Sequence, residues 1–188
     1  MDVVNSGTRP IRLGAFVDGV GWVEHEYGRV WQREDNRLVA APDQGQIDLI
    51  LKLAKEVQGP FQLSYVLLVP RDEGEDEGRF DLAEPLSFDA LRVFLRRFRK
   101  LFEEDGRHHL TITSTCRASI VYDQHNVLYL SGPLDLFVRV LGEAGLHEGE
   151  VRFPSPHSHH YHDELDSMLD DLLEDYEWRC YAPEPVSG

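Results

Sequence analysis

Apolar residues recur at the three- to four-residue spacing of an amphipathic helix in four stretches of the chain. The four stripes lie within residues 47–57, 91–102, 134–141 and 165–173. Asp43 and Gln46 have the spacing of a capping box before the first stripe, and Ser87 is a candidate N-cap before the second. Pro133 suits the first turn of the third helix, and Asp163 begins the fourth. We therefore predict four helices.

Shorter apolar or alternating runs predict β-strands between these helices. The runs cover residues 11–17, 61–69, 110–122, 127–130, 151–153 and 178–181, and a small meander or hairpin is expected within residues 21–40. The segment Asp123-Gln124-His125-Asn126 is made of turn-forming residues and predicts an antiparallel hairpin. Within the first arm of that hairpin, Arg117 and Ala118 mark a bulge or a second turn.

Together these elements predict an α+β fold, a mixed and largely antiparallel β-sheet with its helices packed mainly on one face. The length of 188 residues suits a single domain, which we assign to residues 1–182, followed by a C-terminal tail at 183–188. The glycine-containing acidic run at residues 71–79 has nothing to bury and is expected to form a solvated loop.

The lack of a secretory signal and of a membrane-spanning run predicts a cytoplasmic protein. Residues 1–10 lack the pattern of a secretory signal, and the longest apolar run, at residues 65–69, is far shorter than the roughly 20 residues that cross a bilayer. Cys116 and Cys180 are far apart in the sequence, so neither a disulfide framework nor a zinc ribbon is expected. We expect two buried thiols, with a single disulfide as the alternative if their strands lie side by side.

The formal net charge of −15 favours a basic partner and disfavours nucleic acid and anionic membranes. Acid is concentrated on the last predicted helix, whose candidate partner-binding residues are Asp163, Asp166, Asp170, Asp171 and Glu174. The predicted helix at residues 87–102 is instead rich in arginine, so the two helices either contact each other or face separate partners.

The first functional hypothesis is therefore a non-catalytic interaction protein that binds a basic protein. Its acidic surface would include the last helix and the loop at residues 72–77. In size and charge, though in no motif, the chain is similar to small acidic immunity proteins, which neutralise basic toxins. This hypothesis predicts binding that weakens as salt increases.

The second hypothesis rests on the segment P-S-P-H-S-H-H-Y-H at residues 154–162. Its candidate metal ligands are His157, His159, His160 and His162, with Asp163 or Glu164 completing the shell. Two histidines separated by one residue project from the same face of an extended chain, and neutral imidazole binds zinc and other divalent transition metals. The alternative is an exposed histidine-rich loop that binds metal only loosely.

Catalytic motifs are weak throughout the chain. Cys116 lacks the downstream arginine of a phosphatase loop, and no P-loop, G-x-S-x-G or H-E-x-x-H motif occurs. Cys116 could pair with His108, His109 or His125 only if folding brought them together. The sequence therefore assigns no catalytic residue and no cofactor beyond the candidate metal.

Overall fold

The chain folds into an α+β architecture, seen in a computed structural model that describes residues 11–70 and 78–181. The helices are α1 (Gln46–Glu56), α2 (Phe88–Arg97), α3 (Arg99–Glu104), α4 (Leu134–Glu143) and α5 (Asp166–Glu174), the last preceded by a 3-10 turn at Asp163–Leu165. None of the helices in this part of the chain combines the length and the apolar composition that crossing a bilayer requires.

The strands form a large sheet and a small one. In spatial order the large sheet contains β10 (His147–Glu148), β3 (Val30–Glu34), β4 (Arg37–Ala41), β9 (Leu128–Ser131), β8 (Ser119–Tyr122), β7 (His108–Ser114), β5 (Phe61–Leu67), β6 (Gly78–Leu82) and β12 (Trp178–Tyr181). The small sheet contains β11 (His157–His159), β1 (Leu13–Val17) and β2 (Gly21–Glu24). All pairs are antiparallel except β10 with β3.

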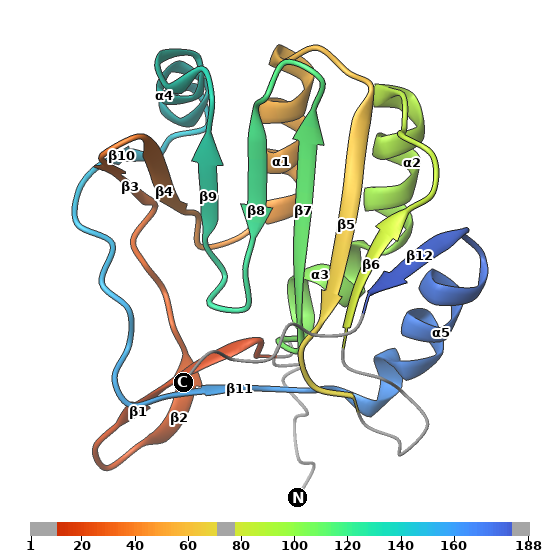
Figure 1. Cartoon of the computed structure of the whole chain (residues 1–188). Coiled ribbons are helices and arrows are strands. Elements are labelled where there is room, and N and C mark those ends of the chain that lie inside the picture. Colours follow the sequence, from red (N-terminus) through yellow and green to blue (C-terminus); the bar gives the residue numbers. More distant parts are fainter. Residues whose placement is uncertain (1–10, 71–77, 182–188) are drawn as a thin grey trace, which may run out of the picture.

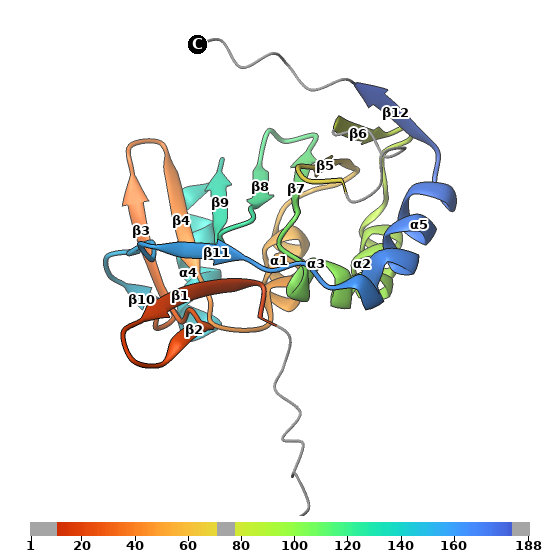
Figure 2. The same ribbon diagram turned by 90° about the horizontal axis from the view of Figure 1, so that it is seen from below.

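The helices α1, α2 and α4 cover one face of the large sheet, as predicted (Figure 1). The small sheet lies across the end of the large sheet toward which the β8–β9 turn points (Figure 1). The view from below shows β11 and β1 passing in front of that end (Figure 2). Two segments far apart in the sequence, the β8–β9 turn and β11, are thereby brought together.

Two apolar clusters lie on opposite faces of the large sheet. The main core joins the helices to the sheet and contains Leu38 and Ala40 of β4. The alternate residues of the same strand, Val39 and Ala41, belong to a second cluster with Val127, against which Tyr27 and Tyr129 pack. This alternation is expected of a strand that is buried on both faces.

Most predicted helices are confirmed, but the first begins differently. The N-cap of α1 is Gly45, whose φ of 73° is left-handed, and no side chain caps the helix. Asp43 instead accepts a hydrogen bond from the Gly28 amide at 2.8 Å, so the capping-box prediction is wrong. Ser87 does cap α2, accepting from the Ala90 amide at 3.2 Å. The long second helix is interrupted at Phe98 and continues as α3.

The run at residues 110–122 is two strands, β7 and β8, joined by a turn in which Arg117 has a φ of 62°, so of the two alternatives at Arg117 and Ala118 the second turn is observed. Other strand predictions need correction. Residues 151–153 do not form a strand, and β6 and β10 were not predicted. The C-terminal tail expected at 183–188 and residues 71–77 of the acidic loop expected at 71–79 lie outside the described residues, whereas Gly78 and Arg79 belong to β6.

Both cysteines are exposed and free, so the prediction of buried thiols is wrong. Cys116 lies in the β7–β8 turn, where its sulfur is 3.8 Å from Oε1 of Gln58. Cys180 lies in β12, which pairs with β6 at the far edge of the large sheet. The strands β7 and β12 are therefore not neighbours.

A buried arginine joins the small sheet to the large one. The Arg12 side chain is 1% exposed, and its guanidinium donates to the main-chain oxygens of Phe102, His108 and Asp123. It also lies over the Tyr122 ring, with its Cζ atom 4.2 Å from the ring centroid. A single cation thus links the segment before β1 to the end of α3, the start of β7 and the end of β8.

We predict that Arg12→Met lowers the free energy of unfolding by about 3 kcal/mol, because buried carbonyl groups lose a charged donor. Urea unfolding measures the loss. Arg33→Met is the matched control, since Arg33 is exposed and pairs only with exposed Asp135 among the described residues, a contact worth about 1 kcal/mol at most. Equal losses in the two variants would contradict a special role for Arg12.

We also predict that His108 makes the protein sensitive to acid. Burial, followed by the charges of Arg12 and Arg107, holds the His108 pKa well below its usual value. Below about pH 6.5 the unfolded chain binds a proton at this residue that the folded chain does not. The free energy of unfolding therefore decreases as the pH is lowered, by at most about 1.4 kcal/mol per pH unit. His108→Phe should flatten this dependence between pH 6.5 and 5 in denaturant titrations.

The control for this experiment is His147→Phe, because His147 is exposed in β10. The control should keep the slope of the wild-type protein. An unchanged slope in His108→Phe would mean that the acid sensitivity arises elsewhere.

Candidate metal centre

Three histidines from the two sheets meet at the end of the large sheet. His125 lies in the β8–β9 turn, whereas His157 and His159 lie in β11. Each offers one ring nitrogen, and these three atoms all lie within 4.8 Å of one another. The ring centroids are 5.3 Å apart for His125 and His157, 5.1 Å for His125 and His159, and 5.3 Å for His157 and His159. We call these residues the three-histidine cluster.

Strand alternation places two of the three rings. In β11, His157 pairs with Ala15 and His159 pairs with Leu13 of β1. Residues two apart in a strand share a face, so both rings project to the same side. The intervening Ser158 faces the other way.

The β8–β9 turn places the third ring. One carboxylate oxygen of Asp123, Oδ1, accepts from the His125 amide at 2.9 Å. Asn126 adopts a left-handed φ of 67°, which asparagine tolerates, and its side chain accepts the Tyr122 hydroxyl at 2.6 Å. The Tyr27 hydroxyl donates to the His125 carbonyl at 2.7 Å. His125 is therefore held by both its own turn and the segment after β2.

Hydrogen bonds also fix the tautomers of two rings. Nδ1 of His125 lies 2.9 Å from Oδ2 of Asp123, and Nδ1 of His157 lies 3.1 Å from the Pro154 carbonyl. A carbonyl or ionised carboxylate can only accept, so each Nδ1 carries the proton and each neutral ring keeps its lone pair on Nε2. Metal-binding histidines are oriented by the same kinds of partner.

The third ring is neutral at physiological pH. Burial, assisted by the neighbouring His125 and His157 and by Arg12, lowers the pKa of His159 to about 4, although Asp123 acts in the opposite direction. Nδ1 of His159 is buried and has no hydrogen-bond partner among the described residues. A neutral imidazole in this position needs no deprotonation before it binds a metal ion.

The predicted histidine segment divides between two environments. His157 and His159 belong to the cluster, but Nε2 of His160 lies 3.2 Å from the Ser158 hydroxyl, and His162 donates from Nε2 to the Ile11 carbonyl at 3.0 Å. Neither of these two rings joins the group of candidate metal ligands found in the described part of the chain.

The carboxylates suggested to complete the shell, Asp163 and Glu164, are exposed in the 3-10 turn and likewise lie outside this group.

His125 was not predicted as a metal ligand. The sequence indicated only that His125 lies in a hairpin turn and could pair with Cys116. That nucleophile pair does not form, because Cys116 and His125 lie in turns at opposite ends of β8. The available signal was the spacing Asp123-x-His125 inside a turn, which allows the carboxylate to bond both the amide and the ring of the histidine.

The acidic residues of α5 lie away from this cluster, and three of the five candidate partner-binding residues, Asp163, Asp166 and Asp171, have partners within the chain. Asp166 pairs with Arg107, and Asp171 lies 3.8 Å from Arg97 of α2, which also pairs with Asp175. Of the alternatives left open by the sequence, contact between the basic and acidic helices is therefore observed. Asp163, Asp170 and Glu174 are exposed.

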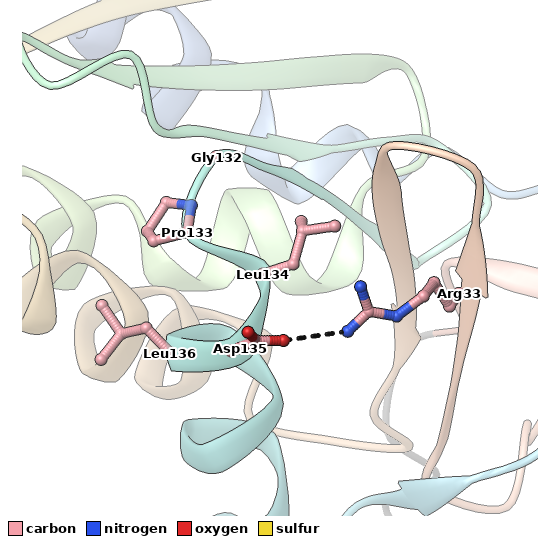
Figure 3. A pocket seen from close by; sticks show the side chains of 6 residues that line it. All are labelled: Arg33, Gly132, Pro133, Leu134, Asp135 and Leu136. Carbon is pink, nitrogen blue, oxygen red and sulfur yellow. Dashed lines mark hydrogen bonds and ion pairs between the residues drawn. The ribbon is translucent and has the colours of Figure 1, made fainter.

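A shallow hollow of about 440 Å³ lies at the start of α4 (Figure 3). Arg33 and Asp135 face each other across it and are 3.3 Å apart. The two side chains are exposed to solvent, and Asp135 already neutralises the charge of Arg33. The three-histidine cluster, with its converging donors and fixed tautomers, is the better candidate site.

Comparisons with known proteins add no information about this site. No protein-family model matches the chain, and searches of curated proteins and of solved structures found no match either.

We predict that Asp123→Asn weakens divalent metal binding by about 10- to 100-fold, because the carboxylate that orients and polarises His125 is lost. Competition with a chromophoric chelator measures the affinity. Asp135→Asn is the matched control, since Asp135 is exposed beside α4 and should leave affinity unchanged. Equal affinities in the two variants would rule out orientation by Asp123.

Proposed function

We propose that the protein binds one divalent transition-metal ion, with zinc the first candidate, through His125, His157 and His159. The observation that carries this proposal is the convergence of three ring nitrogens within 4.8 Å of one another. The three rings pack edge-to-face on one another, and this packing leaves one nitrogen of each ring close to the other two. A single cation could bind all three nitrogens at once.

The donor chemistry selects the class of metal. Imidazole nitrogens suit zinc, copper and nickel, whereas magnesium and calcium prefer oxygen ligands. Two rings keep their lone pair on Nε2 because Asp123 and Pro154 accept from Nδ1. The low pKa of His159, about 4, means that protons compete weakly for its ring at neutral pH.

Metal binding at this position would also stabilise the fold. The ligands come from the β8–β9 turn and from β11, so one ion would link the large sheet to the small sheet. A ligand that binds only the folded chain adds to the free energy of unfolding, by about 2.7 kcal/mol when its free concentration is a hundredfold above its dissociation constant.

We predict that the chain, purified without an affinity tag or chelator, binds one equivalent of zinc and gains about 2.7 kcal/mol under those conditions. His125→Ala and the double variant His157→Ala/His159→Ala should each lose both effects. Isothermal titration and thermal unfolding with and without zinc provide the measurements.

Two further variants sharpen this experiment. His147→Ala is a control for the loss of an exposed histidine and should bind zinc normally. His160→Ala should also keep the site, whereas loss of zinc in this variant would favour the histidine segment itself as the ligand set. Loose binding of several ions, unchanged by His125→Ala, would refute the proposed centre and favour an accidental histidine-rich loop.

The binding of a basic protein partner through α5 remains a second prediction. Arg107 and Arg97 already pair with Asp166 and Asp171, which leaves Asp170 and Glu174 as exposed carboxylates. An acidic helix face is most simply a solvated one. The salt dependence of any partner binding is the observation that would support this function.

A further inference from the structure

The three-histidine cluster provides fewer ligands than a divalent transition metal accepts. Tetrahedral zinc takes four ligands, and sites with three protein ligands leave the fourth position to water or another small molecule. In residues 11–70 and 78–181, no fourth histidine, cysteine or carboxylate joins the group. Both free cysteines lie elsewhere, in the β7–β8 turn and in β12.

The charges around the cluster favour an anion at that position. Three neutral imidazoles leave the full double positive charge on the ion. The Asp123 carboxylate lies 2.9 Å from the His125 ring, and the Arg12 guanidinium donates to the Asp123 main-chain oxygen at 2.8 Å. With one negative and one positive side chain beside a doubly charged ion, the site stays cationic although the chain carries a net charge of −15. A nearby anion would gain electrostatic energy in this partly buried setting.

The two sides of the cluster differ in their surroundings. The Phe153 ring packs edge-on against His125, with centroids 5.5 Å apart, and Tyr27 packs against Phe153 at 6.1 Å. His157 is exposed and leaves a route from solvent to the cluster. The aromatic rings of Phe153 and Tyr27 thus form one side of the site, which we call the aromatic wall, and the side at His157 is open to solvent.

We propose that the metal centre holds an exchangeable fourth position that binds small anions with nitrogen or oxygen donor atoms. This inference rests on the proposed metal-binding function. It assigns the site a ligand of its own, beyond the ion, and places that ligand beside the open edge at His157 rather than beside the aromatic wall.

Cobalt(II) replaces zinc in the test because its visible spectrum reports coordination. The cobalt-loaded protein is titrated with sodium azide, at constant ionic strength kept with sodium perchlorate. We expect a saturable spectral change that corresponds to one azide per cobalt. The cobalt-loaded His147→Ala variant should give the same titration, because His147 lies in β10, outside the cluster.

Asp123→Asn separates this proposal from a structural effect. Removing the carboxylate charge should weaken cobalt binding. The same change should strengthen azide binding to the cobalt-saturated protein by about fivefold, because one nearby negative charge no longer repels the azide. Opposite changes in the two affinities are not expected from a loss of folding. Weaker azide binding in this variant would contradict the electrostatic argument.

The two proposals fail in different ways. If one equivalent of cobalt does not bind, the metal-binding function is wrong and this inference falls with it. If cobalt binds but the spectrum does not change over the whole azide titration, the metal site stands, and the exchangeable position is refuted because another ligand fills it.

Discussion

The buried guanidinium of Arg12 is the constraint on which the arrangement of the two sheets depends. A cation removed from water must be surrounded by acceptors, and here main-chain carbonyls from α3, β7 and the end of β8 provide them. Those carbonyls belong to segments that end near the β8–β9 turn. Satisfying one charge therefore brings the start of β1 to the same place as His125, and β11 follows because it pairs with β1.

Arg12 also affects the chemistry of the neighbouring histidines. Its charge contributes to the lowered pKa values of His108, His109 and His159. All three rings are then neutral at physiological pH, which suits His108 for burial beside Phe102 and suits His159 for binding a cation. The same interaction thus supports both the packing of the core and the candidate metal centre.

The fold could be predicted from local patterns, because apolar spacing records which face of each element is buried. Helical stripes and the Ser87 cap located the helices well, whereas Gly45 shows that a left-handed glycine can replace a side-chain cap without a spacing signal. Residues 151–153 look like a strand because Val151 is apolar, yet Val151 is buried in the second cluster without pairing.

Only two of the three residues of the candidate site could be predicted from local patterns. His157 and His159 are two residues apart, so strand alternation alone indicates a shared face. His125 is more than 30 positions earlier, and its contribution depends on how the small sheet lies on the large one. Arg12, a single residue next to a strand, contributes to that placement, and no periodic pattern reveals it. Long-range polar contacts of this kind are what sequence reasoning lacks.

The pairing of β11 with β1 makes the length of the preceding segment part of the site. A shift by one residue would turn Ser158 and His160 toward His125 and carry His157 and His159 to the other face. Gly14 suits the observed register, because a Cβ atom there would lie 2.7 Å from Nε2 of His160, and the missing side chain leaves room for that ring. A one-residue insertion before β11 that moved the strand along β1 would therefore abolish the three-histidine cluster while leaving every histidine in the chain.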